Sequence, residues 1–222
     1  LLRRPSLREQ GGDHAGQHRR PPVVAVRPHL IRAGPAWPSV RAMAALDGYT
    51  EGTFSYEGEE RTVFRQGSGP AVIVIAEIPG ITPLVADFGR RVAEIGCTAV
   101  LPSLFGTPGR EPSTGYALKS IAGACVSRDF ATWARNKTSP VTRWLRALAR
   151  HEHAECGGPG VGVVGMCLTG NFALAMMVDP VVQAPVLSQP SLPFVLSKGH
   201  KRDLNLSPDD LREVKARLEA DP

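Results

Sequence analysis

One segment of the sequence has residue types and spacing that suit nucleophilic catalysis. It runs from Gly165 to Gly170 with the sequence GMCLTG, directly after an apolar run and directly before a helical pattern. This is the spacing of a nucleophile elbow, stretched by one residue and with Cys where Ser is more common. A thiol at the start of a helix lies where the helix dipole and free N–H groups favour its anion. The pattern predicts Cys167 as a nucleophile, and the alternative is a buried Cys in a tight turn.

A second candidate is an acidic residue, Glu77, which follows the apolar run Ala71–Ile75 by two positions. In an open α/β sheet, ligands bind outside the carboxyl ends of the strands. An unpaired carboxylate is costly in a buried setting, so Glu77 needs a role at such an edge. Two roles stay open for it: a part in catalysis, or capping of main-chain N–H groups in the loop that follows.

The elements that must position these residues alternate between strand and helix. Two short strands, 53–56 and 61–65, flank a Glu57-Gly58-Glu59 turn and predict an antiparallel ribbon. Buried strands are expected at 71–75, 98–101, 161–164 and 181–187, and helices at 82–95, 130–153, 170–178 and 208–219. Residues 103–115 read as a loop. The alternation predicts a doubly wound, mostly parallel α/β sheet that is covered on both faces.

These motifs together resemble the dienelactone hydrolase family of α/β hydrolases. The resemblance rests on Glu-Ile-x-Gly at 77–80, Pro-Ser-Leu at 102–104 and Gly-x-Cys-x-x-Gly at 165–170, and it spans roughly residues 49–220. It implies an α/β-hydrolase fold in which Cys167 is the nucleophile and Glu77 contacts the resting thiol and helps to control its ionisation. It also implies an oxyanion hole formed by the main-chain N–H groups of Ile78 and Leu168.

The sequence departs from the family pattern in its C-terminal part. Family members complete a Cys-His-Asp triad with an Asp and a His after two later strands, whereas only 55 residues follow Cys167 here. We therefore expect the chain to be incomplete at its C-terminus, and by itself weakly active or inactive. His200 reads as a solvated loop residue, and His151 and His153 as surface residues at a helix end. Thr169 stands where the family usually has a second Gly.

The N-terminal 42 residues differ in composition from the rest of the chain. They contain eight Arg against two acidic residues, a net charge of +6, which leaves −1 for residues 43–222 of the total of +5. Six Pro and the lack of a sustained apolar period predict a disordered extension at 1–42. We expect residues 43–222 to form a partial dienelactone-hydrolase-like domain, with Met43 as the natural start.

Composition narrows the range of functions further. The chain has 222 residues, 42% of them hydrophobic, and lacks the run of about 18 apolar residues that a membrane helix needs. Its four Cys show no metal-ligand spacing, so no metal or organic cofactor is implied. An Arg- and Pro-rich arm without interleaved aromatic residues is a weak sign of nucleic-acid binding, so we expect neither a nucleic-acid nor a membrane partner. A cytoplasmic location is expected.

The sequence therefore predicts a thiol-dependent hydrolase that resembles carboxymethylenebutenolidase. Its substrate would be a small-molecule ester or lactone, cleaved through an acyl-enzyme on Cys167. The alternative is a catalytically silent α/β-hydrolase-like domain that serves binding or interaction. The sequence makes no prediction of the oligomeric state.

Overall fold

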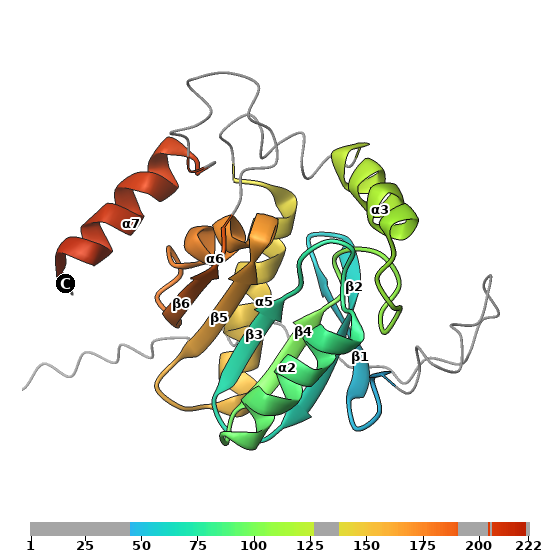
Figure 1. The fold of residues 1–222 in the computed structure, drawn as a ribbon. Coiled ribbons are helices and arrows are strands. Elements are labelled where there is room, and N and C mark those ends of the chain that lie inside the picture. The colour runs from blue at the N-terminus through green and yellow to red at the C-terminus, as the bar shows by residue number, and fades with distance from the viewer. Residues whose placement is uncertain (1–44, 127–137, 191–203, 205, 221–222) are drawn as a thin grey trace, which may run out of the picture. The chain divides into compact units, whose positions relative to one another are not determined.

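A six-stranded sheet with helices on both faces forms the centre of the protein (Figure 1). The computed structural model describes residues 45–126, 138–190, 204 and 206–220. The strands are β1 (Thr50–Tyr56), β2 (Glu59–Gly67), β3 (Ala71–Ile75), β4 (Thr98–Pro102), β5 (Val161–Met166) and β6 (Val182–Ser188). Their order is β1-β2-β4-β3-β5-β6, with β4, β3, β5 and β6 parallel and the β1–β2 ribbon antiparallel. The predicted α/β-hydrolase-type fold is confirmed.

The predicted N-terminal extension, residues 1–42, and its boundary with the domain lie outside the described residues. The helices of the described part are α2 (Pro83–Glu94), α3 (Thr114–Val126), α5 (Pro140–Cys156), α6 (Gly170–Met176) and α7 (Pro208–Ala220). None of these helices combines the length and the apolar composition needed to cross a membrane.

The central strand β3 separates two apolar layers. Ile73 and Ile75 pack in one cluster with residues of α5 and α6, whereas Val74 packs in the other with residues of α2. All three side chains are fully buried, as expected for a parallel strand covered on both faces. The strand is apolar at every position because both of its faces are buried.

Capping residues fix the starts of α2 and α5. Thr82 accepts a hydrogen bond from Val85 N–H (3.4 Å) at the start of α2, and Ser139 accepts one from Thr142 N–H (3.2 Å) at the start of α5. The expected helix over 130–153 is confirmed from Pro140 onward, but it is interrupted before that residue because Ser139 is extended and Pro140 opens α5. Residues 130–137 of that expectation lie outside the described part.

Helix α3 was not expected from the sequence, which indicated a loop up to residue 115 and no helix before 130. Ser113 Oγ accepts a hydrogen bond from Tyr116 N–H (3.3 Å) and so caps the helix start. The segment contains two Gly and no clear apolar stripe, so helical periodicity does not reveal it.

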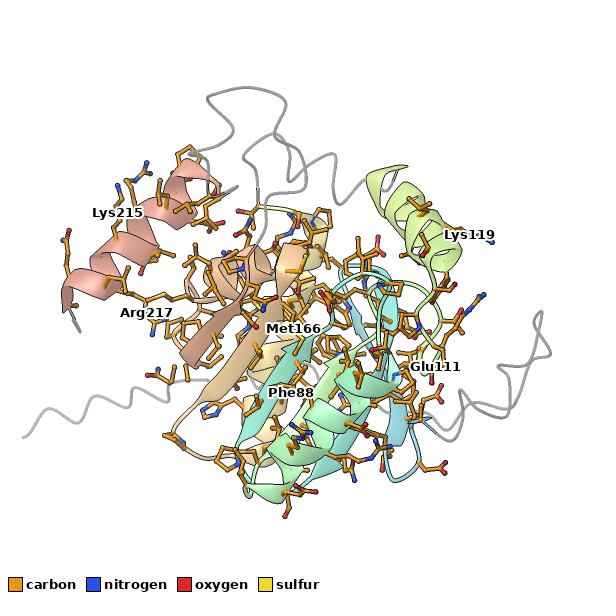
Figure 2. All side chains as sticks on the ribbon, in the orientation of Figure 1. Phe88, Glu111, Lys119, Met166, Lys215 and Arg217 are labelled. Carbon is orange, nitrogen blue, oxygen red and sulfur yellow. The ribbon has the colours of Figure 1, made fainter. Side chains whose placement is uncertain are left out.

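Polar contacts attach α7 to the rest of the fold. Asp210 on α7 is buried and pairs with Arg146 of α5 at 2.9 Å. Arg217 reaches from α7 to the carbonyl oxygens of Asp179 (3.1 Å) and Val182 (3.2 Å), at the start of β6 (Figure 2). Ser207 caps the start of α7, since its Oγ accepts a hydrogen bond from Asp210 N–H at 3.1 Å.

The ionisation of Tyr49 gives a testable pH dependence of stability. Tyr49 donates a hydrogen bond to the carbonyl oxygen of Ala86 (2.7 Å), and burial raises its pKa from 10.0 to about 12. Between these values the unfolded chain loses the phenolic proton and the folded chain keeps it, so this stabilisation is complete below pH 10 and is lost towards pH 12. We expect the wild-type advantage over Tyr49→Phe in free energy of unfolding, measured by denaturant titration, to shrink across this interval. A constant difference from pH 9 to pH 12 would contradict the assignment.

Candidate active site

The register between β3 and β5 brings the two predicted motif segments to one edge of the sheet. The strands are parallel neighbours, and Ile75 is paired with Gly165. Glu77 and Cys167 each lie two residues beyond this pair. Ile78 and Leu168 each lie three residues beyond it. Because the two strands are parallel, both segments leave the sheet at its carboxyl edge.

Cys167 occupies a strained turn between β5 and α6. Its φ is +54°, a value that is uncommon for a residue other than Gly. A single 3₁₀ turn, Cys167–Thr169, leads directly into α6. Together these features form the strand–turn–helix arrangement that the sequence predicts for a nucleophile elbow.

The two glycines of the elbow provide the space that this turn requires. A Cβ on Gly165 would lie 2.3 Å from the carbonyl oxygen of Thr169, and a Cβ on Gly170 would lie 2.9 Å from Cβ of Pro190. Both distances are shorter than real Cβ contacts. The two positions therefore require Gly for close packing of the turn.

The predicted nucleophile and the residues of the predicted oxyanion hole share one apolar environment. Leu168 is 7% exposed and belongs to the cluster on the α5 and α6 side of the sheet. Cys167 and Ile78 are half-buried and pack against the same cluster, as do Leu104 and Phe105 from the loop after β4. A thiol in this position is partly shielded from water.

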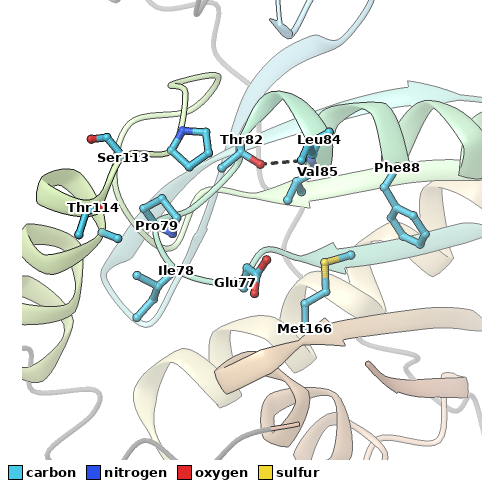
Figure 3. A pocket seen from close by; sticks show the side chains of 12 residues that line it. Glu77, Ile78, Pro79, Thr82, Leu84, Val85, Phe88, Ser113, Thr114 and Met166 are labelled. Carbon is cyan, nitrogen blue, oxygen red and sulfur yellow. Dashed lines mark hydrogen bonds between the residues drawn. The ribbon is translucent and has the colours of Figure 1, made fainter. Parts of the chain in front are cut away.

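Glu77 is exposed at the mouth of an open pocket of about 590 Å³. Figure 3 shows its side chain and that of Met166 projecting into this pocket, between α2 and the segment that leads into α3. The carboxylate accepts no hydrogen bond from a described residue, and only the main-chain oxygen of Glu77 accepts one, from Gly80 N–H at 2.7 Å. Capping of the following loop by the side chain, one of the two open roles, is therefore not seen. Between these two described residues, the carboxylate accepts no hydrogen bond from the thiol of Cys167 either, although the family resemblance implies that contact.

Most of the remaining pocket lining was not singled out from the sequence. It comes from three separate segments: Pro79, Thr82, Leu84, Val85 and Phe88; Pro112, Ser113, Thr114 and Ala117; and Met166. Cys167, the next residue after Met166, does not line this pocket. The residues are brought together by the fold, and no local pattern marks them.

The described histidines lie far from Cys167. His151 and His153 are near the end of α5, which leads into the start of β5, whereas Cys167 follows the end of that strand. Contrary to expectation, His151 is half-buried and stacks on Phe54 with ring centroids 5.1 Å apart. His200 lies outside the described residues. Within the described ranges, no group of three His, Cys, Asp or Glu side chains is arranged to hold a metal ion.

Comparison with known proteins agrees with this geometry. The model of the dienelactone hydrolase family matches residues 61–200. A protein from Klebsiella pneumoniae subsp. pneumoniae, assigned as a dienelactone hydrolase, has a solved structure that is similar with a TM-score of 0.51 and 19% identity, covering 78% of this chain and 80% of that one. A dienelactone hydrolase-like promiscuous phosphotriesterase from metagenomic libraries gives a TM-score of 0.49 and 17% identity, covering 78% and 77%. No curated protein matches the chain.

The family match covers more than half of the chain, and it includes both motif segments that meet at the carboxyl edge of β3 and β5. The resemblance seen in the sequence is thereby confirmed. The structural similarity independently supports the same fold. The chain belongs to the dienelactone hydrolase family.

Proposed function

We propose that this protein is a thiol hydrolase that cleaves a small ester or lactone, as carboxymethylenebutenolidase-type enzymes do. Family membership supports hydrolase activity. The observation that carries the thiol mechanism is the backbone of Cys167, a non-Gly residue at φ +54° in a strand-to-helix turn. Strained conformations of this kind persist where the surroundings hold them, and they cluster at functional sites.

Cys167 acts as the nucleophile in a two-step reaction. Its sulfur forms a bond to the acyl carbon of the substrate, and the bond from that carbon to the leaving oxygen breaks, so that a thioester and an alcohol result. Water then attacks the thioester and releases the acid and the thiol. A negatively charged oxygen forms in both steps, and in this proposal the main-chain N–H groups of Ile78 and Leu168 stabilise it.

Glu77 acts on the proton of the thiol. It is the only charged residue among the described residues that line the pocket. The carboxylate of Glu77 can accept the thiol proton when the substrate arrives. Glu77 therefore acts as a proton acceptor during the acylation step.

The pocket beside Glu77 reaches Met166, the residue before Cys167, so it accommodates the part of a small substrate that extends away from the acyl carbon. Its described lining is mainly apolar, with hydroxyl groups from Thr82, Ser113 and Thr114. Such a site suits an ester or lactone with an apolar portion, oriented by a few polar contacts.

A catalytically silent binding domain is the second candidate function. The observation that favours it is the distance of both described histidines from the elbow, because they lie towards the opposite end of β5. Such a domain would retain the pocket beside Glu77 and bind small molecules without forming a thioester. Acylation of Cys167 distinguishes the two functions.

Replacement of the nucleophile tests the proposal. With p-nitrophenyl acetate, Cys167→Ala should abolish formation of the acyl-enzyme, because no other group occupies the elbow. Peptide mapping by mass spectrometry should place the acetyl group on Cys167 of the wild type. Cys97→Ala and Cys156→Ala are controls, since both residues are half-buried free thiols elsewhere in the fold and should leave acetylation intact. Acetylation mapped to either control Cys, or none at all, would contradict the thiol mechanism.

A charge replacement tests the role of Glu77. Glu77→Gln removes the group that can accept the thiol proton, so acylation of Cys167 by p-nitrophenyl acetate should slow by about 100-fold. Glu111→Gln is the matched control, because Glu111 is exposed nearby and does not line the pocket. Equal acylation rates for the wild type and Glu77→Gln would remove Glu77 from the mechanism.

The close packing of the elbow gives a further prediction. In Gly165→Ala the new methyl group would collide with the main chain of Thr169, so the turn must open and the N–H of Leu168 must move. A misplacement of about 1 Å can cost about 100-fold in rate, and acylation of Cys167 should fall by that order. Gly115→Ala is the control, because a Cβ there meets nothing within 4 Å. Unchanged acylation in Gly165→Ala would show that the turn tolerates opening.

A further inference from the structure

Thr169 makes an unusual set of contacts for a residue inside the elbow. Its side chain is completely buried, with 0% exposure. Its hydroxyl oxygen accepts a hydrogen bond from Met166 N–H at 2.9 Å. The hydroxyl proton is within reach of two carbonyl oxygens, that of Ile75 at 2.9 Å and that of Met166 at 2.8 Å. The hydroxyl therefore links Thr169 to Met166 at the end of β5 and to Ile75 at the end of the neighbouring strand β3.

The contact with Ile75 is placed where the ordinary pairing of the two strands stops. The ladder between β3 and β5 ends with the pair of Ile75 and Gly165. Beyond it, the chain from β3 continues to Ile78 and the chain from β5 continues to Leu168. The hydroxyl of Thr169 thus joins the end of β3 to the turn that carries Cys167, just before the two segments reach the reacting groups.

We propose that Thr169 is a positioning residue that sets the separation between the two main-chain donors of the oxyanion hole. An oxyanion hole works only if its donors are held about 3 Å from the oxygen that becomes charged. Leu168, which supplies one donor, precedes Thr169 directly, and Ile78, which supplies the other, lies three residues beyond Ile75. This inference rests on the proposed function and adds a residue that touches no reacting atom.

A comparison of two reactions of the same thiol tests this role. Acylation by p-nitrophenyl acetate passes through an oxyanion: a sulfur–carbon bond forms, the ester bond breaks and p-nitrophenolate leaves with the bonding electrons. Alkylation by iodoacetamide forms a sulfur–carbon bond and expels iodide without an oxyanion. The ratio of the two rates at Cys167 therefore reports on the oxyanion hole separately from the reactivity of the thiol.

We expect Thr169→Val, which keeps the shape and removes the hydroxyl, to lower the acylation rate by about 10- to 100-fold while alkylation changes by less than about threefold. Thr169→Ser restores the hydroxyl and should restore the ratio. Thr98→Val is the matched control, because Thr98 is also buried and its hydroxyl donates to the Gly69 carbonyl (2.8 Å) at the opposite end of the sheet. Its ratio should equal that of the wild type.

The outcomes separate this proposal from the function on which it rests. If the acetyl group maps to a residue other than Cys167 in the wild type, the proposed function fails. A second outcome is an acetyl group on Cys167 together with a Thr169→Val variant that lowers the acylation rate and the alkylation rate by the same factor, or changes neither rate. In both of these cases only the role of Thr169 is overturned. If Thr169→Val does not fold, Thr169→Ala carries the same test. Failure of both to fold, with Thr98→Val folded, would overturn the positioning role in favour of a purely structural one.

Discussion

The parallel pairing of β3 with β5 is the constraint on which the site depends. The pair of Ile75 and Gly165 sets equal offsets for Glu77 and Cys167, so two motifs far apart in the sequence meet at one edge. Burial of β3 on both faces fixes that register, because a slip of one residue would exchange the side chains facing the two apolar layers. The geometry of the site is in this sense a consequence of core packing.

Helix α6 directly follows the strained turn at Cys167, and contacts with neighbouring residues hold it at both ends. At its start, the main chain of Thr169 packs directly on Gly165. At its end, Arg146 from α5 donates to the carbonyl oxygen of Ala175 (3.1 Å), and Arg217 from α7 donates to that of Met177. Cations near the last carbonyls of a helix complement its dipole. Two neighbouring helices thus stabilise the short helix that must hold Cys167 at a positive φ.

Features that depend on local pattern were predictable, and features that depend on distant contacts were not. The apolar run of β3, the periodicity of α2 and the Gly spacing around Cys167 each record a local requirement, and the structure agrees with all three. Helix α3 lacks such a pattern. The role proposed for Thr169 could not be predicted for a different reason, because its hydrogen-bond partner Ile75 is 94 positions away in the sequence. In the sequence, Thr169 is noticeable only because it stands where the family usually has Gly.

The central claim is that Cys167, Ile78 and Leu168 converge on a single carbonyl group. A crystal structure of the protein reacted with a small trifluoromethyl ketone tests it most directly, because addition of the thiol to the ketone leaves a charged oxygen that mimics the reaction intermediate. The account predicts a bond from Sγ of Cys167 to the carbonyl carbon, with the oxygen about 3 Å from the main-chain nitrogens of Ile78 and Leu168. An inhibitor bonded to another Cys, or an oxygen directed away from both nitrogens, would contradict it.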